Sequence, residues 1–378
     1  MARVLFHVQH LLGIGHLQRS LRIVEALIDA GVAVTLVQGG PPIAGIGPPR
    51  GVDVVQLPLI RSRDATFALV DEADAPIDDA LRAARRDKLL TAFAATRPDA
   101  VVIEGFPFAR RAFRFELDPL IAAVRESRPR PRLISSVRDI PTIRGDAARL
   151  AAIVARVHDA FDAVLVHGDE RFIPFDASFP AAPEIADRLH YTGYVTTLAS
   201  PSDDNVPEGE ILVSVGGGAA GRALVTAAIE ARRQGCLAAR GWRILTGTSL
   251  AEEELETIRR TAPSGVSVER FRRDFAALLG RCHVSVSQAG YNTVLDILAA
   301  RARAVLVPFA AERETEQTIR AEHLAARGAA IVVRESDLSP TVLAHAIEHA
   351  AARDPVPLAI NTDGARRSAA LIARLIAT

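Results

Sequence analysis

Short apolar runs recur along the whole chain, and stretches with a helical pattern separate them. In the first half these runs cover residues 4–8, 32–37, 52–57, 100–103, 133–137 and 164–166. In the second half they cover residues 211–215, 243–245, 266–268, 284–286, 304–307 and 330–333. Strands that are apolar on both faces and alternate with helices indicate parallel sheets covered on two sides. The pattern therefore predicts an α/β fold of doubly wound, Rossmann-like sheets.

The length of 378 residues is too great for one ordinary core and suits two domains. We expect a linker over residues 198–209, where the chain is polar and lacks periodicity. This places the first domain at residues 1–197 and the second at 210–358. The last helical pattern follows a proline-rich break, so we expect residues 359–378 to return to the first domain. Two such domains are expected to face a cleft at the carboxyl ends of their strands, where ligands bind.

The overall composition and the lengths of the apolar runs argue against several classes of protein. The chain has 45 basic and 45 acidic residues, so its zero net charge gives no reason to expect nucleic acid as a partner. Cys236 and Cys282 are too few for a disulfide framework and lack metal-ligand spacing. The chain opens on a strand-like run without the pattern of a secretory signal, and no apolar run reaches the roughly 18–20 residues that span a bilayer. We expect a cytoplasmic protein and leave peripheral contact with the inner face of the membrane open.

A glycine-containing turn with a histidine follows the first apolar run. Gly13 and Gly15 precede His16, just before the helical pattern over residues 17–30. Only two glycines of the dinucleotide fingerprint G-x-G-x-x-G are present, which argues against a dinucleotide site. The positive end of the helix dipole favours a neutral imidazole, as a general base requires. The alternative is that His16 caps the helix or bonds a neighbouring loop.

A second glycine-rich turn follows the strand-like run at residues 211–215. Three consecutive glycines, Gly216, Gly217 and Gly218, stand where a helix begins. They let the backbone approach a phosphate closely, and the free amides and dipole of a helix N-terminus favour a diphosphate. The alternative is a tight strand–helix turn that binds nothing.

A third turn, after the run at residues 284–286, carries the sharpest signal. Gly290 allows a close turn, and the first amides of a helix that starts near Tyr291 can meet phosphate oxygens. Asn292 and Thr293 offer side-chain hydrogen bonds to the same group, and Asp296, one turn further on, can accept both hydroxyls of a ribose. The alternative is a helix capped by Asn or Thr with an exposed acid.

This third turn resembles a known sugar-donor box. The sequence Gln288-Ala-Gly-Tyr-Asn-Thr-x-x-Asp296 is similar to the H-C-G-W-N-S-x-x-E box of nucleotide-sugar glycosyltransferases with the GT-B fold. The following Pro308-Phe309 and Glu316-Gln317 are similar to the P-x-(n)-[DE]-Q segment, whose acid and glutamine hold donor-sugar hydroxyls. The G-x-G-H turn that ends at His16 resembles the N-terminal turn of the MurG-like group, glycosyltransferase family 28.

The resemblance implies a role for each matching residue. His16 would deprotonate an acceptor hydroxyl, and Glu316 with Gln317 would hold the donor sugar. Asp296 would bind the ribose, and Phe271 would lie near the base. The residues that it assigns to the donor nucleotide are Gly216, Gly217, Gly218, Phe271, Gln288, Gly290, Asn292, Thr293 and Asp296.

Three departures from the family box leave the identity of the nucleotide open. Gln288 replaces a histidine, Tyr291 a tryptophan and Asp296 a glutamate. In the first domain, the acids Glu104 and Asp139 follow two strand-like runs, so both are candidates to orient His16 or to contact the acceptor. The alternative is that they are ordinary loop acids of an α/β domain.

The sequence therefore predicts a GT-B enzyme that moves a sugar from a nucleotide-diphosphate donor, a UDP-sugar, to the hydroxyl of a small-molecule or lipid-linked acceptor. We expect no metal, since the chain has no D-x-D pair, and no cofactor, since the nucleotide-sugar is itself a substrate; inversion is implied by the resemblance alone. The string from Gly13 to Ser20, which includes Arg19, also resembles UDP-sugar hydrolases of the same group. A hydrolase or hydrolysing epimerase is therefore the alternative, and a non-catalytic nucleotide-sugar binding protein is the third hypothesis.

Two further patterns have a structural interpretation. His345, Glu348 and His349 match an H-x-x-E-H zinc pattern, but the apolar stripe through Leu343 and Ile347 places both histidines on a neighbouring face. Residues 106–115 mix phenylalanine with arginine. They would line an acceptor pocket, touch an anionic membrane, or begin a helix with a buried aromatic face, and we favour the last.

Overall fold

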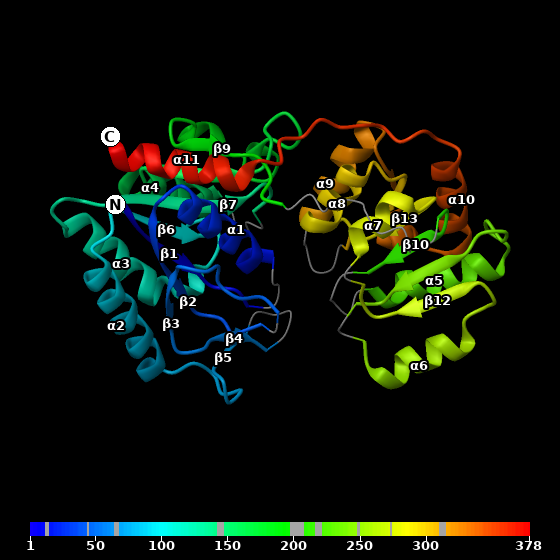
Figure 1. The fold of residues 1–378 in the computed structure, drawn as a ribbon, viewed down its shortest axis with the longest axis horizontal. Coiled ribbons are helices and arrows are strands. Elements are labelled where there is room, and N and C mark those ends of the chain that lie inside the picture. The colour runs from blue at the N-terminus through cyan, green and yellow to red at the C-terminus, as the bar shows by residue number, and fades with distance from the viewer. Residues whose placement is uncertain are drawn as a thin grey trace. The chain divides into compact units, whose positions relative to one another are not determined.

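The chain folds into two compact units. The first consists of Met1–Thr196 together with Ile360–Thr378, and the second of Thr197–Ala359. The computed structural model describes residues 1–11, 15–43, 45–63, 68–141, 147–196, 208–215, 221–247, 250–272, 274–309 and 315–378. Each unit contains a parallel sheet with helices on its faces (Figure 1).

A seven-stranded sheet forms the centre of the first unit, in the order β3-β2-β1-β6-β7-β8-β9. Its strands are β1 (Arg3–Val8), β2 (Ala33–Gln38), β3 (Asp53–Gln56), β6 (Ala100–Glu104), β7 (Arg132–Arg138), β8 (Ala163–His167) and β9 (Leu189–Tyr191). All neighbouring pairs are parallel. The chain order reverses between β1 and β6, and the carboxyl ends of such a strand pair are where doubly wound folds bind ligands.

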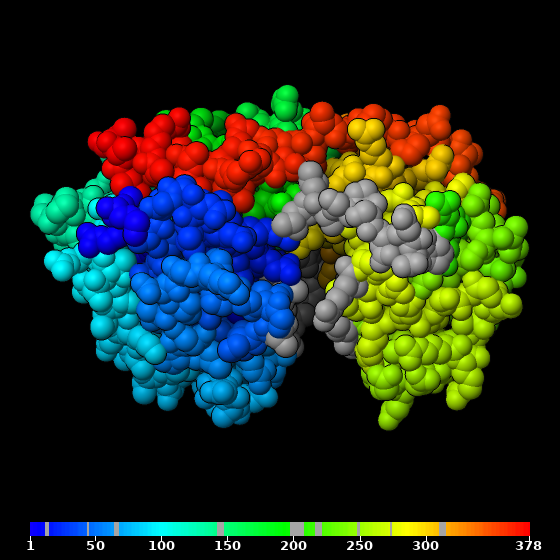
Figure 2. All heavy atoms as spheres, viewed as in Figure 1, coloured from blue at the N-terminus to red at the C-terminus, as the bar shows by residue number. Residues whose placement is uncertain are grey.

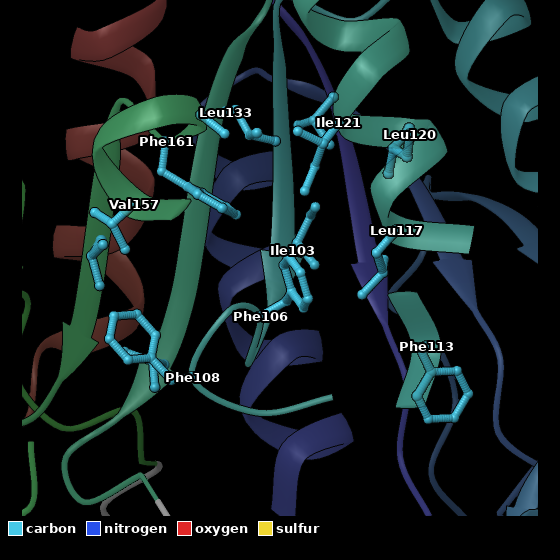
Figure 3. Close-up of a cluster of buried hydrophobic side chains, with 14 of the residues drawn as sticks. Ile103, Phe106, Phe108, Phe113, Leu117, Leu120, Ile121, Leu133, Val157 and Phe161 are labelled. Carbon is cyan, nitrogen blue, oxygen red and sulfur yellow. The ribbon is translucent and has the colours of Figure 1, made fainter. Parts of the chain in front are cut away.

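Helices cover both faces of this sheet. They are α1 (Gly15–Asp29), α2 (Asp79–Thr96), α3 (Arg114–Glu126), α4 (Ala147–Ala160) and α11 (Gly364–Ala377). Because side chains alternate along a strand, Val4 and Phe6 pack with α1 and α11, whereas Leu5 packs with α2, α3 and α4. Figure 3 shows Leu117 and Ile121 of α3 pointing toward the sheet that carries Ile103.

The C-terminal segment completes the first unit. Helix α11 packs against α1 and buries Ala369 and Ile372. Just before it, Tyr194 N donates to Asn361 O at 2.7 Å. Gly193 has a φ of +90°, and a Cβ there would lie 2.6 Å from the Asn361 side chain, so this crossing requires glycine. The red atoms of the C-terminal end lie over the blue atoms of the N-terminal segment in Figure 2.

A buried ion pair fixes several loops of the first unit. Arg85 of α2 is fully buried and donates through Nε and Nη2 to Glu116 of α3, at 2.7 and 2.8 Å. Its remaining donors reach Gly39 O, Pro58 O and Gln9 Oε1. One guanidinium with all five N–H groups bonded therefore joins the carboxyl ends of β1, β2 and β3 to two helices.

The second unit has a six-stranded parallel sheet in the order β12-β11-β10-β13-β14-β15. Its strands are β10 (Ile211–Ser214), β11 (Trp242–Leu245), β12 (Val266–Glu269), β13 (Val284–Ser287), β14 (Ala304–Leu306) and β15 (Ile331–Val332). Its helices are α5 (Gly221–Arg233), α6 (Glu252–Thr261), α7 (Phe275–Arg281), α8 (Tyr291–Ala300), α9 (Glu316–Ala326) and α10 (Pro340–Ala351). Here the order reverses between β10 and β13, the strands that precede the second and third glycine-containing turns.

The predicted fold class is confirmed, because both units are doubly wound parallel α/β sheets. The buried-aromatic interpretation of residues 106–115 is also confirmed, since Phe106, Phe108 and Phe113 are at most 3% exposed. Leu343 and Ile347 of α10 are buried as predicted. In the described part of the chain, no helix combines the length and the apolar character needed to cross a membrane.

Candidate functional site

The first group of candidate residues lies where the chain order of the first sheet reverses. His16 stands in the first turn of α1, which follows β1, and Glu104 is the last residue of the neighbouring strand β6. Their side chains meet, with Nδ1 of His16 2.6 Å from Oε1 of Glu104. Glu104 is 1% exposed and His16 is 26% exposed, so the carboxylate is enclosed while part of the imidazole stays accessible. Gly13 lies outside the described residues.

Two arginines surround Glu104. Arg19, one helical turn after His16, donates from Nη2 to Glu104 Oε1 at 2.6 Å. Arg110 approaches the other carboxylate oxygen, with Nη2 3.6 Å from Oε2. Burial alone would raise the pKa of Glu104, but His16, Arg110 and Arg19 together hold it well below its ordinary value. Glu104 is therefore ionised at neutral pH.

His16 is neutral under the same conditions. Burial and the charges of Arg110 and Arg19 outweigh the opposing effect of Glu104 and lower the pKa of His16 to about 4. An ionised carboxylate only accepts hydrogen bonds, so the proton of the neutral ring must be on Nδ1 and donated to Glu104. The lone pair of Nε2 is then available, and no described residue bonds to that atom. This arrangement can accept a proton from a bound hydroxyl.

Asp139, the other acid expected beside His16, has different surroundings. It directly follows β7 and is fully buried, with Oδ2 3.4 Å from the hydroxyl of Tyr194. Glu104 is thus the acid that contacts the imidazole. Sequence reasoning did not assign Arg110 to this group and considered Arg19 only for the hydrolase alternative.

The second group lies at the carboxyl end of β13, at the reversal point of the second sheet. Helix α8 begins at Tyr291, as predicted, and Gly290 is its N-cap. Asn292 and Thr293 occupy the first turn and are partly exposed, as is Asp296 one turn later. The unpaired first-turn amides of such a helix suit an anion. Residues Gly216–Gly218 lie outside the described part of the chain.

The prediction that Gly290 is there to allow a close turn was wrong. Its φ of −64° and ψ of 151° are open to any residue, so the turn does not require glycine. Among the described residues, an added Cβ would meet only Thr293 Oγ1, at 3.9 Å, so these residues leave room for it. Because Gly290 has no side chain, a ligand can approach the backbone at the start of α8 closely.

The residues expected to hold the donor sugar are close to this helix start. Gln317 Oε1 accepts hydrogen bonds from Ala289 N and Phe309 N, both at 3.1 Å. Glu316 is buried, and Arg320 Nη2 donates to its Oε1 at 2.7 Å. Gln288 directly precedes Ala289 and is partly exposed.

Phe271 follows β12 at the same edge of the sheet. With 66% of its surface exposed, it is one of the few large apolar side chains of the described chain that face solvent. A single exposed apolar side chain is ordinary on a protein surface, so the exposure shows only that Phe271 is accessible to a ligand.

Comparison with solved structures gives the class of fold. The calicheamicin glycosyltransferase CalG4 superposes with a TM-score of 0.63 at 18% identity, over 100% of this chain and 94% of that one. MurG of Acinetobacter baumannii superposes with a TM-score of 0.60 at 16% identity, over 100% and 99%. The chain therefore has the GT-B fold of glycosyltransferases.

Sequence comparison narrows this class. Residues 211–375 match the glycosyltransferase family 28 C-terminal domain, so the chain carries that domain and the resemblance to the MurG-like group is confirmed. The UDP-N-acetylglucosamine–N-acetylmuramyl-(pentapeptide) pyrophosphoryl-undecaprenol N-acetylglucosamine transferase of Synechococcus sp. (strain JA-2-3B'a(2-13)) is 31% identical over 147 residues, 38% of this chain and 39% of that one. The transferase of the same name from Phenylobacterium zucineum (strain HLK1) is 26% identical over 263 residues, 67% and 70%. The match to the first relative thus spans about two fifths of its length.

Proposed function

We propose that this protein is a metal-independent, inverting glycosyltransferase that moves a sugar from a UDP-sugar to an acceptor hydroxyl. The observation that carries the proposal is the His16–Glu104 pair, with Nδ1 and Oε1 2.6 Å apart. It gives a neutral imidazole whose other nitrogen has an available lone pair, held by an ionised carboxylate.

In the proposed reaction, His16 Nε2 takes the proton of the acceptor hydroxyl while the acceptor oxygen attacks the anomeric carbon of the donor. The bond from that carbon to the diphosphate breaks, and the nucleoside diphosphate leaves with the electron pair. Ionised Glu104 stabilises the imidazolium that forms, at 2.6 Å. The amides at the start of α8, with Asn292 and Thr293, stabilise the charge on the leaving diphosphate.

The donor would lie along the carboxyl edge of the second sheet. We assign Asp296 to the ribose, Phe271 to the base, and Glu316 with Gln317 to the sugar. The names of the MurG relatives specify a lipid-linked acceptor, a pyrophosphoryl-undecaprenol. We therefore propose lipid-linked acceptors as well as small molecules for this protein. A lipid-linked acceptor would bring the protein to the inner face of the membrane from the cytoplasm.

The experiment has two stages. A thermal-shift panel of UDP, dTDP and GDP with their sugar derivatives identifies the donor, because a tight ligand stabilises the folded state measurably. Release of nucleoside diphosphate is then followed with the selected donor, with and without acceptor extracts, in the presence of EDTA. Acceptor-dependent release in EDTA supports the proposal, whereas rapid sugar release without acceptor would identify a hydrolase.

His16→Ala is the diagnostic variant. A general base predicts turnover about 10²–10⁴-fold slower, with donor affinity unchanged. His158→Ala, which changes an exposed histidine at the end of α4, is the matched control. Wild-type turnover in His16→Ala would exclude this histidine as the base.

A further inference from the structure

One buried arginine links the two parts of the proposed donor site. Arg320 lies on α9, four residues after Glu316, and is 1% exposed. Its Nη1 donates to Ala289 O at 2.8 Å, and its Nη2 donates to Glu316 Oε1 at 2.7 Å. Its guanidinium also lies 5.7 Å from the ring centre of Tyr291, the first residue of α8.

The turn before α8 is held through both backbone groups of one residue, Ala289. Ala289 N donates to Gln317, and Ala289 O accepts from Arg320, so α9 takes both backbone groups of this residue. Ala289 itself is fully buried. The direction of the first amides of α8 is therefore set by side chains of α9.

The contacts of Gln317 also define its orientation. Two backbone N–H groups, of Ala289 and Phe309, point at the same side-chain atom, which must be the carbonyl oxygen. Its amide nitrogen is then directed away from the turn and has no partner among the described residues. Gln317 can thus present a donor to a ligand.

We propose that Arg320 is a positioning residue of the donor site, which holds the sugar-binding pair and the diphosphate-binding helix start in one geometry. The inference rests on the proposed function. The fork of the guanidinium suits this position because it donates to two acceptors in different directions, a carbonyl and a carboxylate. A buried carboxylate also requires a paired cation, which Glu316 receives at Oε1.

Arg320→Met should separate the two parts of the site. In this variant Gln317 still anchors the turn through Ala289 N and Phe309 N, so the helix start keeps one of its restraints. Glu316 loses the guanidinium that orients it. We expect the affinity for a UDP-sugar to fall about 10- to 100-fold, the range for a lost charge-assisted hydrogen bond, and the affinity for UDP to change by less than about threefold.

Calorimetric titration with UDP and UDP-N-acetylglucosamine, or with the pair that the thermal-shift panel selects, measures both affinities. Arg327→Met is the matched control, because Arg327 ends the same helix and donates to His323 O. Arg320→Lys keeps the charge without the fork, so its loss of UDP-sugar affinity should be intermediate. If Arg320→Met does not fold, the lysine variant decides on the same criterion.

The outcomes are distinct. Failure of the wild-type protein to bind any nucleotide or nucleotide sugar would reject the proposed function. If the wild type binds and the folded Arg320 variants bind UDP-sugar as well as it does, the positioning role is wrong. Equal losses for UDP and UDP-sugar would also overturn it, since they would reflect damage to the whole unit.

Discussion

The charge of Glu104 should control the rate of the proposed reaction. Glu104→Gln preserves the size of the side chain and an oxygen that accepts from His16 Nδ1, but it removes the charge. Neutral His16 is little affected, whereas the imidazolium that forms during reaction loses its counterion. Taking the charge centres as about 4 Å apart in an effective dielectric constant of about 20, the lost interaction is about 4 kcal/mol. The proton is only partly transferred in the transition state, so only part of this interaction energy is lost there. We therefore expect kcat to fall about 10²–10³-fold.

The pH dependence of kcat tests the role of Glu104 independently, through the direction in which its acid limb moves. With a pKa of about 4, wild-type His16 is a base throughout the neutral range, and its activity should decline only as pH falls toward that value. Glu104 raises the pKa of His16 against burial and two arginines. Removing its charge should therefore lower that pKa further, so that the acid limb of the kcat profile moves to lower pH while its plateau falls.

The assay is nucleoside diphosphate release at saturating donor and acceptor from about pH 3 to about pH 9, so that the range extends below the pKa of about 4 of wild-type His16. Glu126→Gln, at the exposed end of α3, is the matched control. An unchanged kcat in Glu104→Gln, or an acid limb that moves to higher pH, would refute the assigned role of the pair.

Three further variants test other parts of the structure. Asp296→Ala should weaken UDP binding measured by calorimetry, and unchanged affinity would remove its ribose role. Arg85→Met leaves Glu116 buried without its cation, so the free energy of unfolding in urea should drop by about 3–5 kcal/mol; a drop below about 1 kcal/mol would contradict a structural ion pair. Gly193→Ala should lower Tm more than Gly235→Ala does, because both glycines have a positive φ but only a Cβ at 193 meets another residue, Asn361. Equal shifts would mean that backbone strain alone explains the effect.

Much of the fold could be predicted because buried parallel strands are continuous apolar runs. All twelve predicted runs correspond to strands in the two sheets. The edge strand β9 was not predicted, since Leu189–Tyr191 is short, half-exposed and contains a histidine. The two-residue strands β4 (Arg61–Ser62) and β5 (Leu69–Val70), which pair antiparallel, carry no detectable period at that length.

The candidate site was predictable only where a turn marked it. His16 and Asn292 follow glycines at strand–helix junctions. The sequence motif therefore predicted that each lies in the first turn of a helix. Arg110 and Arg320 had no such signal. Lys88 is the only lysine of the chain, so nearly every basic residue is an arginine. A functional arginine can therefore be recognised only from its contacts in the structure.

The return of the C-terminal helix sets the order in which this protein is completed during synthesis. Val195 lies in the same apolar cluster as Ala369 and Ile372 of α11, although more than 160 residues of the second unit separate them in the chain. On the ribosome, α1 must therefore wait for its covering helix until the second unit has emerged. A fragment that stops at residue 359 would expose apolar surface of α1, so a separately expressed first unit needs residues 360–378 joined to residue 196 by a short tether.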